Sequence, residues 1–489
     1  MKTATTTAAQ LEEAGRRLDA SYHASEGVRA HHFIREWAGQ PAWPQAAAKG
    51  TTKERAPIYS KRRLDTLAEV CLPNGIFIPG RFGRIYVDDP AHGEPWLSPS
   101  DMLKADLTGL RLISRRYTPT IETLRVRQGW ILLSRSGTIG NMAVVRPDMD
   151  GLVGSDDIIR IVADPARISP GYLYAWLSSP LARALIEQRT YGAVVPHIEA
   201  HHVVDLPVPR LDATIEQRIH ELLERVTELR VEASKLLTGA KSQLLRTIGL
   251  PRLSSQEALT KGRWAFTIGR SDLKQIVLTA WTYNPVTQRL VVTIRSHPHR
   301  ALGELVRPGG IFRGPRFRRI EADQKAGIVL LSQADVFQLR PQGRWISKSA
   351  IPNYDECTVS DGTILVAAQG TMGDNELFGH CQFTHGSLEE AIITEHIMRV
   401  IPDTQKVDPG YLFAFLSSEY GFQLLRSTEF GTKLLGFNRA IVSDLPIPWL
   451  PEAMQRDLGD MVRKAYDKRA EALALEDQAQ ALLTKALQT

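Results

Sequence analysis

The sequence predicts an α+β protein built from two copies of one module, each followed by a long amphipathic helix. Three observations support this class. A ten-residue motif occurs twice, 239 positions apart; short strand-like and helix-like segments follow the same order in both halves; and apolar residues at alternating spacings of three and four follow each half. The repeat fixes where every other motif lies, because equivalent positions recur at nearly the same offset.

The clearest copy of the repeat is a predicted helix. Pro170–Ser179 reads PGYLYAWLSS and Pro409–Ser418 reads PGYLFAFLSS, so eight of ten positions are identical. Proline suits the first turn of a helix, because that position has no intrahelical partner for a backbone N–H. The same offset relates Asp205–Pro209 (DLPVP) to Asp444–Pro448 (DLPIP), which closes each module.

Upstream of this helix the repeat continues with slightly smaller offsets. Gly129–Gly140 matches Gly362–Gly373 at an offset of 233, and both segments end in Gly-Thr-x-Gly. Gly75–Phe77 matches Gly310–Phe312 at an offset of 235. The drift indicates small insertions, which loops tolerate. We expect one insertion in the first module, between residues 140 and 155.

Each module is predicted to contain the same elements in the same order. A short helix begins at Leu67 and at Leu302, and a Gly-Ile-Phe turn with a basic stretch follows. A strand then ends in the Gly-Thr-x-Gly turn. An Ile/Val-rich strand comes next, at Ile158–Val162 and Ile397–Ile401, and leads into the Pro-Gly-Tyr-Leu helix. Mixed short strands and helices are typical of the α+β class.

The segments after the two modules have the apolar periodicity of a coiled coil, sustained over about three heptads. In the first these positions are Ile219, Leu222, Val226, Leu229, Ala233, Leu236 and Ala240. In the second they are Leu458, Met461, Ala465, Lys468, Ala472, Leu475, Ala479 and Leu482, with one charged break.

We interpret the two segments as helices that pair as an antiparallel coiled coil and give the molecule pseudo-twofold symmetry. The alternative is two unrelated surface helices, each packed on its own module. A helix of about 30 residues is roughly 45 Å long, enough to hold the modules apart. The predicted domains are modules at 1–210 and 249–450 and helices at 211–248 and 451–489.

Composition restricts the compartment and permits, without requiring, a nucleic-acid partner. There are 60 Lys and Arg against 54 Asp and Glu, a net charge of +6 that an ordinary basic protein could also have. Cys71, Cys357 and Cys381 have no Cys-x-x-Cys spacing, which argues against a disulfide framework or a zinc site. The polar N-terminus and the absence of an 18-residue apolar run predict a cytoplasmic protein without a membrane span.

Two modules held apart by a rod suit a duplex with two half-sites, because half-site spacing must match protein spacing. The two copies keep their Gly, Pro, aromatic and Leu residues but differ in polar ones. Arg135 and Ser136, for example, correspond to Ala368 and Gln369. This divergence fits two modules that recognise different DNA sequences, although neutral sequence drift after duplication would leave a similar pattern.

Basic and amide side chains supply the candidate DNA contacts. Arginine and lysine neutralise phosphates regardless of sequence, whereas Arg, Asn, Gln and Lys can match base edges. A single surface arginine is more often a solvated charge than a DNA contact. The candidates are Arg81, Arg84, Arg115, Arg116, Arg135, Ser136, Thr138 and His197 in the first module, and Arg316, Arg318, Arg319, Lys348, Gln369, Thr371, Lys433, Asn438 and Arg439 in the second.

Motifs for catalysis are not found. Asn284-Pro285-Val286 fails the Asn-Pro-Pro-aromatic pattern of an adenine methyltransferase, and no Gly-x4-Gly-Lys-Ser/Thr loop for ATP occurs. The adjacent pairs His31-His32 and His201-His202 have the wrong spacing for two metal ligands on one helix face. We therefore expect no catalytic residue and no metal site.

The order of these motifs resembles a known family. Gly-Thr-x-Gly, Pro-x-Tyr-Leu and Leu-Pro-x-Pro before a long helix, occurring twice, resemble the specificity (S) subunit of type I restriction-modification systems. Arg17–Tyr22 resembles the family's module start, and Leu278–Pro285 is a degraded copy of it.

The resemblance implies two target recognition domains, each binding one half of a split double-stranded DNA target. It also implies that the two helices dock two methyltransferase subunits, which supply S-adenosylmethionine binding and adenine-N6 methylation. A restriction subunit with ATP- and Mg-dependent translocation is a further partner in such systems. The S subunit itself is non-catalytic, so this chain is expected to hold no cofactor. The alternative is a recognition or scaffold protein of another defence system, and co-purification with a methyltransferase discriminates the two.

Overall fold

The computed structural model describes residues 25–39, 62–118, 120–190, 196–251, 253, 265–273, 278–373, 376–386, 388–389 and 391–488. Arg17–Tyr22 lies outside them. The chain forms two compact units, and α8 (Ala213–Ile248) and α15 (Glu452–Gln488) each contribute to both. The first unit takes Met1–Leu103, Leu112–Glu228 and Ala472–Thr489, and the second takes Lys104–Arg111 and Leu229–Glu471.

The first unit contains a four-stranded antiparallel sheet in the order β2-β9-β6-β7 and a smaller sheet of four mostly shorter strands in the order β3-β5-β4-β8. All four residues of β6 are buried, because both of its faces are covered. The elements are α3 (Glu26–Trp37), β1 (Arg63–Thr66), α4 (Leu67–Val70), β2 (Cys71–Phe77), β3 (Tyr86–Val87), β4 (Gly93–Leu97), η1 (Asp101–Leu103), β5 (Leu112–Ser114), α5 (Ile121–Leu124), β6 (Ile131–Ser134), β7 (Met142–Val144), η2 (Pro147–Met149), β8 (Val153–Gly154), β9 (Ile158–Ala163), α6 (Pro170–Ser178), α7 (Pro180–Gln188), η3 (Ala200–His202) and β10 (Pro207–Arg210).

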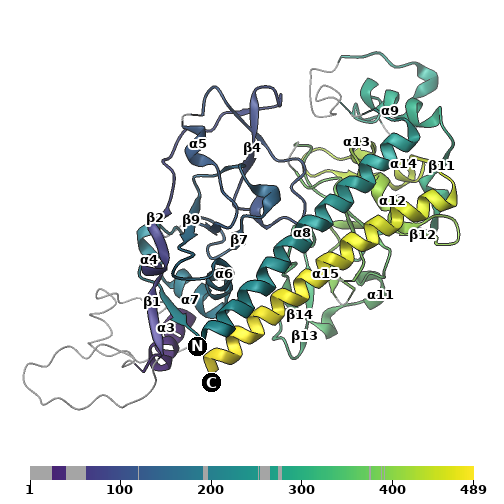
Figure 1. Ribbon diagram of the computed structural model, residues 1–489. Helices are drawn as coiled ribbons and strands as arrows, with labels where there is room; N and C mark the ends of the chain where they lie inside the picture. Colours follow the sequence, from purple (N-terminus) through teal and green to yellow (C-terminus); the bar gives the residue numbers. More distant parts are fainter. Residues whose placement is uncertain are drawn as a thin grey trace, which may run out of the picture. The chain divides into compact units, whose positions relative to one another are not determined.

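The second unit contains a four-stranded sheet in the matching order β12-β18-β15-β16 and a smaller sheet in the order β14-β13-β17. Its elements, coloured green to yellow in Figure 1, are η5 (Arg270–Asp272), α9 (Pro285–Arg295), β11 (His299–Ala301), α10 (Leu302–Leu305), β12 (Val306–Arg313), β13 (Gly327–Leu331), η6 (Asp335–Phe337), β14 (Arg344–Ser347), η7 (Lys348–Ala350), α11 (Tyr354–Cys357), β15 (Ile364–Ala367), β16 (Cys381–Phe383), β17 (Ile392–Ile393), β18 (Ile397–Pro402), α12 (Pro409–Leu416), α13 (Glu419–Arg426), β19 (Glu429–Phe430), β20 (Gly436–Phe437), α14 (Arg439–Ser443) and β21 (Pro446–Pro448).

The predicted mixture of helix and sheet is confirmed, and two pairs of predicted segments take the expected conformations. The two Ile/Val-rich segments are β9 and β18, and the two Pro-Gly-Tyr-Leu segments are α6 and α12, each with proline in its first turn. The Gly-Thr-x-Gly turns follow β6 and β15.

A buried arginine holds the same position in each unit. The Arg160 guanidinium donates hydrogen bonds to the carbonyls of Ser155 (2.6 Å), Ile158 (2.6 Å), Gly154 (2.8 Å) and Leu124 (3.2 Å). Its counterpart, 239 positions later, bonds to the matching carbonyls: Arg399 donates to Thr394, Ile397, Ile393 and Cys357. The two modules therefore share internal hydrogen bonds as well as strand order.

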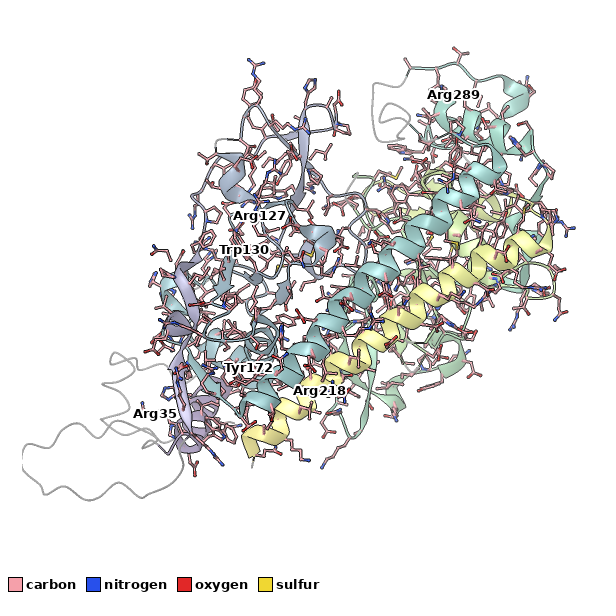
Figure 2. The ribbon with its side chains drawn as sticks, viewed as in Figure 1. Arg35, Arg127, Trp130, Tyr172, Arg218 and Arg289 are labelled. Atoms are coloured by element: carbon pink, nitrogen blue, oxygen red, sulfur yellow. The ribbon has the colours of Figure 1, made fainter. Side chains whose placement is uncertain are left out.

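A tyrosine and a glycine show the same equivalence. The hydroxyl of Tyr172 (Figure 2) donates to the carbonyl of Pro209 at 2.5 Å, and that of Tyr411 donates to Pro448 at 2.5 Å. A Cβ on Gly75 would lie 2.8 Å from a backbone oxygen, and so would one on Gly310. The Gly-Ile-Phe segments were predicted as turns, but they lie within the strands β2 and β12, and this close approach explains why both need glycine.

The expected insertion lies in the other module. Ser155 and Thr394 are equivalent because each binds its unit's buried arginine. From Gly140 to Ser155 the chain advances 15 positions, and from Gly373 to Thr394 it advances 21. The extra residues therefore belong to the second module, where they lengthen the loops around β16 and β17.

Within the second unit, α8 and α15 run in opposite directions. Glu232 and Lys468 form an ion pair, and a Cβ on Gly239 would lie 3.2 Å from the Met461 methyl group. From the first contact to the second, the position on α8 increases by seven residues and the position on α15 decreases by seven. Apolar residues of both helices belong to the core of this unit, among them Leu237, Leu244, Leu458, Val462 and Ala465.

The buried face of the two long helices is wider than the stripe formed by the predicted heptad positions. Of the predicted contacts, Ile219, Leu222, Val226, Leu229, Leu458, Ala465 and Ala472 are buried, whereas Leu236, Met461 and Leu482 are partly exposed. Val462 and Tyr466 are buried although they lie off that stripe. Tyr466 packs edge-on against Phe383 and Phe413 of its own unit. Each helix therefore packs on module residues as well as presenting a stripe to another helix.

One segment of the first half of the sequence belongs to the second unit. The Ala105 N–H donates to the Phe337 carbonyl at 3.0 Å, and Arg469 donates to the Ala105 carbonyl at 3.3 Å. Lys241 lies 3.6 Å from Asp106, and together with Arg469 it lowers the pKa of that carboxyl to about 2, against the effect of burial. Short-range sequence patterns gave no sign of this docking.

Candidate nucleic-acid interface

In the first module, two loops that the sequence keeps far apart meet beside the Gly-Thr-x-Gly turn. Ser136 and His197 form an isolated β-bridge, and the Ile198 N–H donates to the Arg135 carbonyl at 3.0 Å. The turn after β6 is thereby joined to the segment before η3. We call these residues, together with the basic segment 81–84, the first rim. The rim brings Arg84, Arg135, Ser136 and His197 together.

Carboxylates connect the arginines of the first rim. Arg84 donates to Asp156 at 2.6 Å and to Asp157 at 2.7 Å, and Asp157 also pairs with Arg135 at 3.3 Å. Arg135 pairs in addition with Glu199 and is only 3% exposed. The buried Arg135 side chain thus connects the loop that carries Asp157 to the segment that carries Glu199. The rim presents outward the exposed side chains of Arg81 and Thr138.

The second module has a corresponding second rim, formed by residues 313–319, 368–373 and 430–438. Gly370 and Leu435 form the bridge here, with the Leu435 N–H donating to the Gly370 carbonyl at 2.9 Å. Arg316 and Arg319 lie 3.4 and 3.0 Å from Glu395. Arg319 corresponds to Arg84 and Glu395 to Asp156, so one arginine–carboxylate pair recurs in both rims.

The charges in these pairs stay ionised. Burial alone would raise the pKa of Glu395, but a backbone hydrogen bond and the charges of His396 and Arg319 outweigh burial and lower it. Burial likewise opposes the charge on Arg84, whose pKa is nonetheless raised by its hydrogen bonds to Asp157 and Asp156. Much of the arginine charge in each rim is therefore already compensated.

The remaining candidates differ in exposure and in role. Asn438 is partly buried, and its side-chain oxygen caps α14 by accepting from the N–H groups of Ala440 and Ile441. Gln369 is also partly buried, and its backbone bonds to the side chain of Gln333. Twelve of the candidates are exposed: Arg81, Arg84, Arg115, Arg116, Thr138, Arg316, Arg318, Arg319, Lys348, Thr371, Lys433 and Arg439.

Three of the exposed candidates lie next to the smaller sheets rather than in the rims. Arg115 follows β5 and donates to Glu94 at 2.7 Å and to the Ala91 carbonyl at 2.9 Å. Arg116 lies over the Tyr117 ring. Lys348 follows β14 in the second unit. The pairing of Arg115 with Glu94 lowers the pKa of that carboxyl.

Sequence reasoning missed the carboxylates that position these arginines. Asp156, Asp157, Glu199 and Glu395 each bind at least one rim arginine. A signal was present, because an acidic residue recurs at 156 and 395, in each case four positions before an arginine that is also repeated. Arg313 was missed as well; its Nε donates to the Glu395 carbonyl at 2.7 Å.

Glu429 lies beneath the second rim at the start of β19. It is 1% exposed, and its Oε2 has no hydrogen-bond partner in the described structure. Burial raises the pKa of this carboxyl, although a hydrogen bond with Thr279 acts in the opposite direction. The ionised carboxylate is therefore disfavoured in the folded state.

We expect Glu429→Gln to raise the free energy of unfolding at pH 7 by about 1 kcal/mol. A carboxyl whose folded pKa is raised contributes stability below its unfolded pKa and loses that contribution as pH rises through the folded pKa. The difference between variant and wild type should therefore shrink toward pH 4. Urea unfolding at several pH values measures it. The exposed Glu304→Gln is the control, and equal pH dependence of all three proteins would contradict the assignment.

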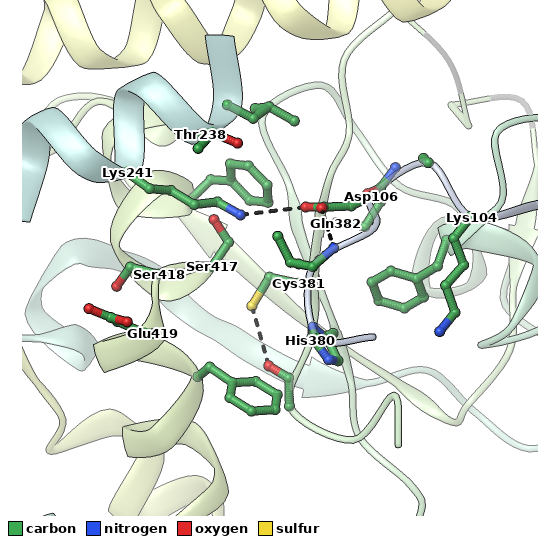
Figure 3. Close-up of a pocket in the computed structure, with 18 of the residues that line it drawn as sticks. Lys104, Asp106, Thr238, Lys241, His380, Cys381, Gln382, Ser417, Ser418 and Glu419 are labelled. Atoms are coloured by element: carbon green, nitrogen blue, oxygen red, sulfur yellow. Dashed lines mark hydrogen bonds and ion pairs between the residues drawn. The ribbon is translucent and has the colours of Figure 1, made fainter. Parts of the chain in front are cut away.

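A cavity of about 520 Å³ lies elsewhere in the second unit. Figure 3 shows its lining, which includes Lys104, Lys241, His380 and Cys381. It contains none of the candidate DNA contacts. Burial lowers the pKa of His380 to about 4, with the charge of Arg426 acting in the same direction, so this imidazole is neutral at physiological pH.

The described residues also hold no group of three His, Cys, Asp or Glu side chains suited to a metal ion. Within the same part of the chain, no helix combines the length and the apolar character that crossing a membrane requires.

Comparison with known proteins shows which proteins this chain is similar to. No protein-family model matches the chain. Over 154 residues the chain is 28% identical to the specificity subunit of the type I restriction enzyme EcoBI from Escherichia coli. The chain is similar to type I specificity subunits. The aligned part spans 30% of this chain and 30% of the relative.

Solved structures of such subunits superpose loosely on the chain. The S subunit of a type I restriction-modification system from M. genitalium is 13% identical, with 88% of this chain and 97% of that chain covered at a TM-score of 0.37. The HsdS subunit from Thermoanaerobacter tengcongensis is 16% identical, with 87% and 96% covered at a TM-score of 0.27. The relationship to specificity subunits therefore rests on the sequence match.

Proposed function

We propose that this chain is the DNA-recognition subunit of a type I restriction-modification complex, with each rim contacting one half of a bipartite double-stranded DNA target. The observation that supports it most is a repeated frame with different exposed residues. Arg160 and Arg399 make equivalent hydrogen bonds, yet the exposed Arg318 of the second rim corresponds to Gly83 of the first. One scaffold that presents two sets of side chains suits two different half-sites.

The proposed domains follow the sequence repeat: recognition domains at 1–210 and 249–450, and helices at 211–248 and 451–489. We propose that the helices pair along their length as an antiparallel coiled coil. The contacts of Glu232 with Lys468 and of Gly239 with Met461 support one register for the second unit. Extending that register pairs Leu222 with residue 478 and Leu229 with residue 471.

Partners would supply the chemistry. In the proposed complex, two methyltransferase subunits dock on the paired helices, bind S-adenosylmethionine and methylate adenine at N6. Restriction subunits with ATP and Mg can join them, and the assembly works in the cytoplasm. This chain contributes DNA contacts and no catalytic residue.

Selection from a random duplex library with the purified full chain tests the proposal. We expect two short conserved blocks separated by a non-specific gap, and affinity that falls steeply with salt because phosphate contacts release counterions. A single block, or no enrichment, would contradict it.

The matched variant replaces four exposed cations, Arg81, Arg316, Arg318 and Lys433, with glutamine. Each lost phosphate contact should reduce the slope of log K against log salt by about 0.9. The exposed Arg218 on α8, labelled in Figure 2, provides the control substitution Arg218→Gln, which should leave the slope unchanged.

A further inference from the structure

The second rim carries an exposed apolar tip. β19 and β20 form a two-stranded hairpin in which Glu429 pairs with Phe437 and Phe430 with Gly436. Its tip, residues 430–434, exposes 50% of Phe430 and 61% of Leu434, on either side of the exposed Lys433. Large apolar side chains this exposed, within a basic surface, are candidates for contact with a partner.

The hairpin is held firmly at its base. The Phe437 ring stacks on the fully buried Phe378 ring, with centroids 4.4 Å apart and planes inclined by 19°. The Asn438 N–H donates to the Thr428 carbonyl at 2.9 Å. The tip therefore projects from a rigid base, so its position is set before any ligand binds.

Glycines give the tip its shape. Gly431 has φ of +112°, a conformation that side-chain-bearing residues rarely adopt. A Cβ on Gly436 would lie 3.3 Å from the Phe430 ring. The absence of that Cβ lets the ring lie against the opposite strand and leaves Leu434 as the most exposed apolar residue of the tip.

The surroundings of the tip favour DNA as its occupant. The bridge between Leu435 and Gly370 ties the hairpin to the Gly-Thr turn that carries Thr371. Lys433 within the tip and Arg439 at the start of α14 add exposed positive charge beside the apolar side chains. A basic surface with apolar residues at its projecting point matches a duplex, whose phosphates flank apolar base edges and thymine methyl groups.

We propose that the 430–434 tip is the base-contacting element of the second module, and that Leu434 enters a groove of the duplex to make an apolar contact with base edges while Lys433 binds the adjacent phosphate. This inference rests on the proposed function and adds a specific element to it. Leu434 supplies sequence selectivity without charge, and Lys433 supplies affinity without selectivity.

The test uses the full-length protein and the duplex that wild type selects from a random library. Leu434→Ser should reduce affinity for that duplex about 10-fold or more, leave the salt slope unchanged, and remove the base preference at one or two positions of one block. Leu434→Met, which keeps the apolar character and volume, should retain most of the affinity. Lys433→Gln should lower the salt slope and keep the base preference.

The equally exposed Val292, 65% accessible on α9, provides the control Val292→Ser, which should bind like wild type. Wild-type affinity and selectivity in Leu434→Ser would overturn the inference and leave DNA recognition by the chain standing. Failure of the wild-type protein to select any duplex would overturn both. Unchanged thermal unfolding of Leu434→Ser, expected for a surface residue, separates loss of contact from loss of folding.

Discussion

Replacing Arg160 with methionine should lower the free energy of unfolding of the first unit by about 3–5 kcal/mol. Methionine fills a similar volume but has no donors, so four backbone carbonyls each lose the hydrogen bond that the arginine donates, in a buried site. Arg160 is fully buried, and burial lowers its pKa to about 10, so the side chain remains charged at neutral pH.

The substitution should also loosen the first rim. The residues whose carbonyls Arg160 binds, Gly154, Ser155 and Ile158, flank Asp156 and Asp157, and those two carboxylates hold Arg84 and Arg135. Loss of the buried arginine therefore removes the support of the residues that position the exposed surface. DNA affinity should fall together with stability.

Urea unfolding followed by tryptophan fluorescence records the transitions of both units, because Trp96, Trp130 and Trp176 belong to the first unit and Trp281, Trp345 and Trp449 belong to the second. Arg399→Met should destabilise the second unit similarly, since its hydrogen bonds are equivalent. The exposed Arg81→Met should change unfolding by less than about 0.5 kcal/mol. A wild-type midpoint for Arg160→Met would show that the buried hydrogen bonds contribute nothing net.

Substitutions in one rim should alter one half of the recognised sequence and leave the other half intact. We expect Thr138→Val to lose selectivity in one block of the selected motif. Thr371→Val with Leu434→Ser should affect the other block. Each lost base contact costs roughly 1–3 kcal/mol, so affinity for the full target should fall about 10- to 100-fold.

The measurement is repeated selection from the random duplex library with each variant. Arg218→Gln, a single charge removed from α8, should return the wild-type motif. If either rim variant changed both blocks equally, the two modules would not read separate half-sites. If neither variant changed a block, the rims would not be the reading surfaces.

The two long helices show most clearly what could be predicted from the sequence and what could not. The heptads correctly predicted two long helices, because their periodicity depends only on positions along each chain segment. They did not predict the burial of Val462 and Tyr466. Those residues face module side chains such as Phe383 and Phe413, which lie many positions away in the sequence.

In the rims, too, some features were predicted from the sequence and others were not. Repetition located both Gly-Thr turns and both basic segments, and the structure places them beside each other in each module. Arg135 was expected to contact DNA, yet here it is buried and paired with Asp157 and Glu199. Whether an arginine is exposed depends on carboxylates brought in by the fold, and single-chain spacing does not encode that.

The sequence by itself determined that a set of motifs recurs in one order, that the two Ile/Val-rich segments are strands and the two Pro-Gly-Tyr-Leu segments are helices, and that a long helix follows each copy. These follow from offsets, periodicity and proline or glycine placement, all of which act locally. Only the tertiary structure decided which arginines are compensated, that residues 104–111 pack in the second unit, and that an apolar hairpin tip projects beside the second Gly-Thr turn. These depend on contacts between residues distant in sequence, where burial and charge pairing are set by the complete fold.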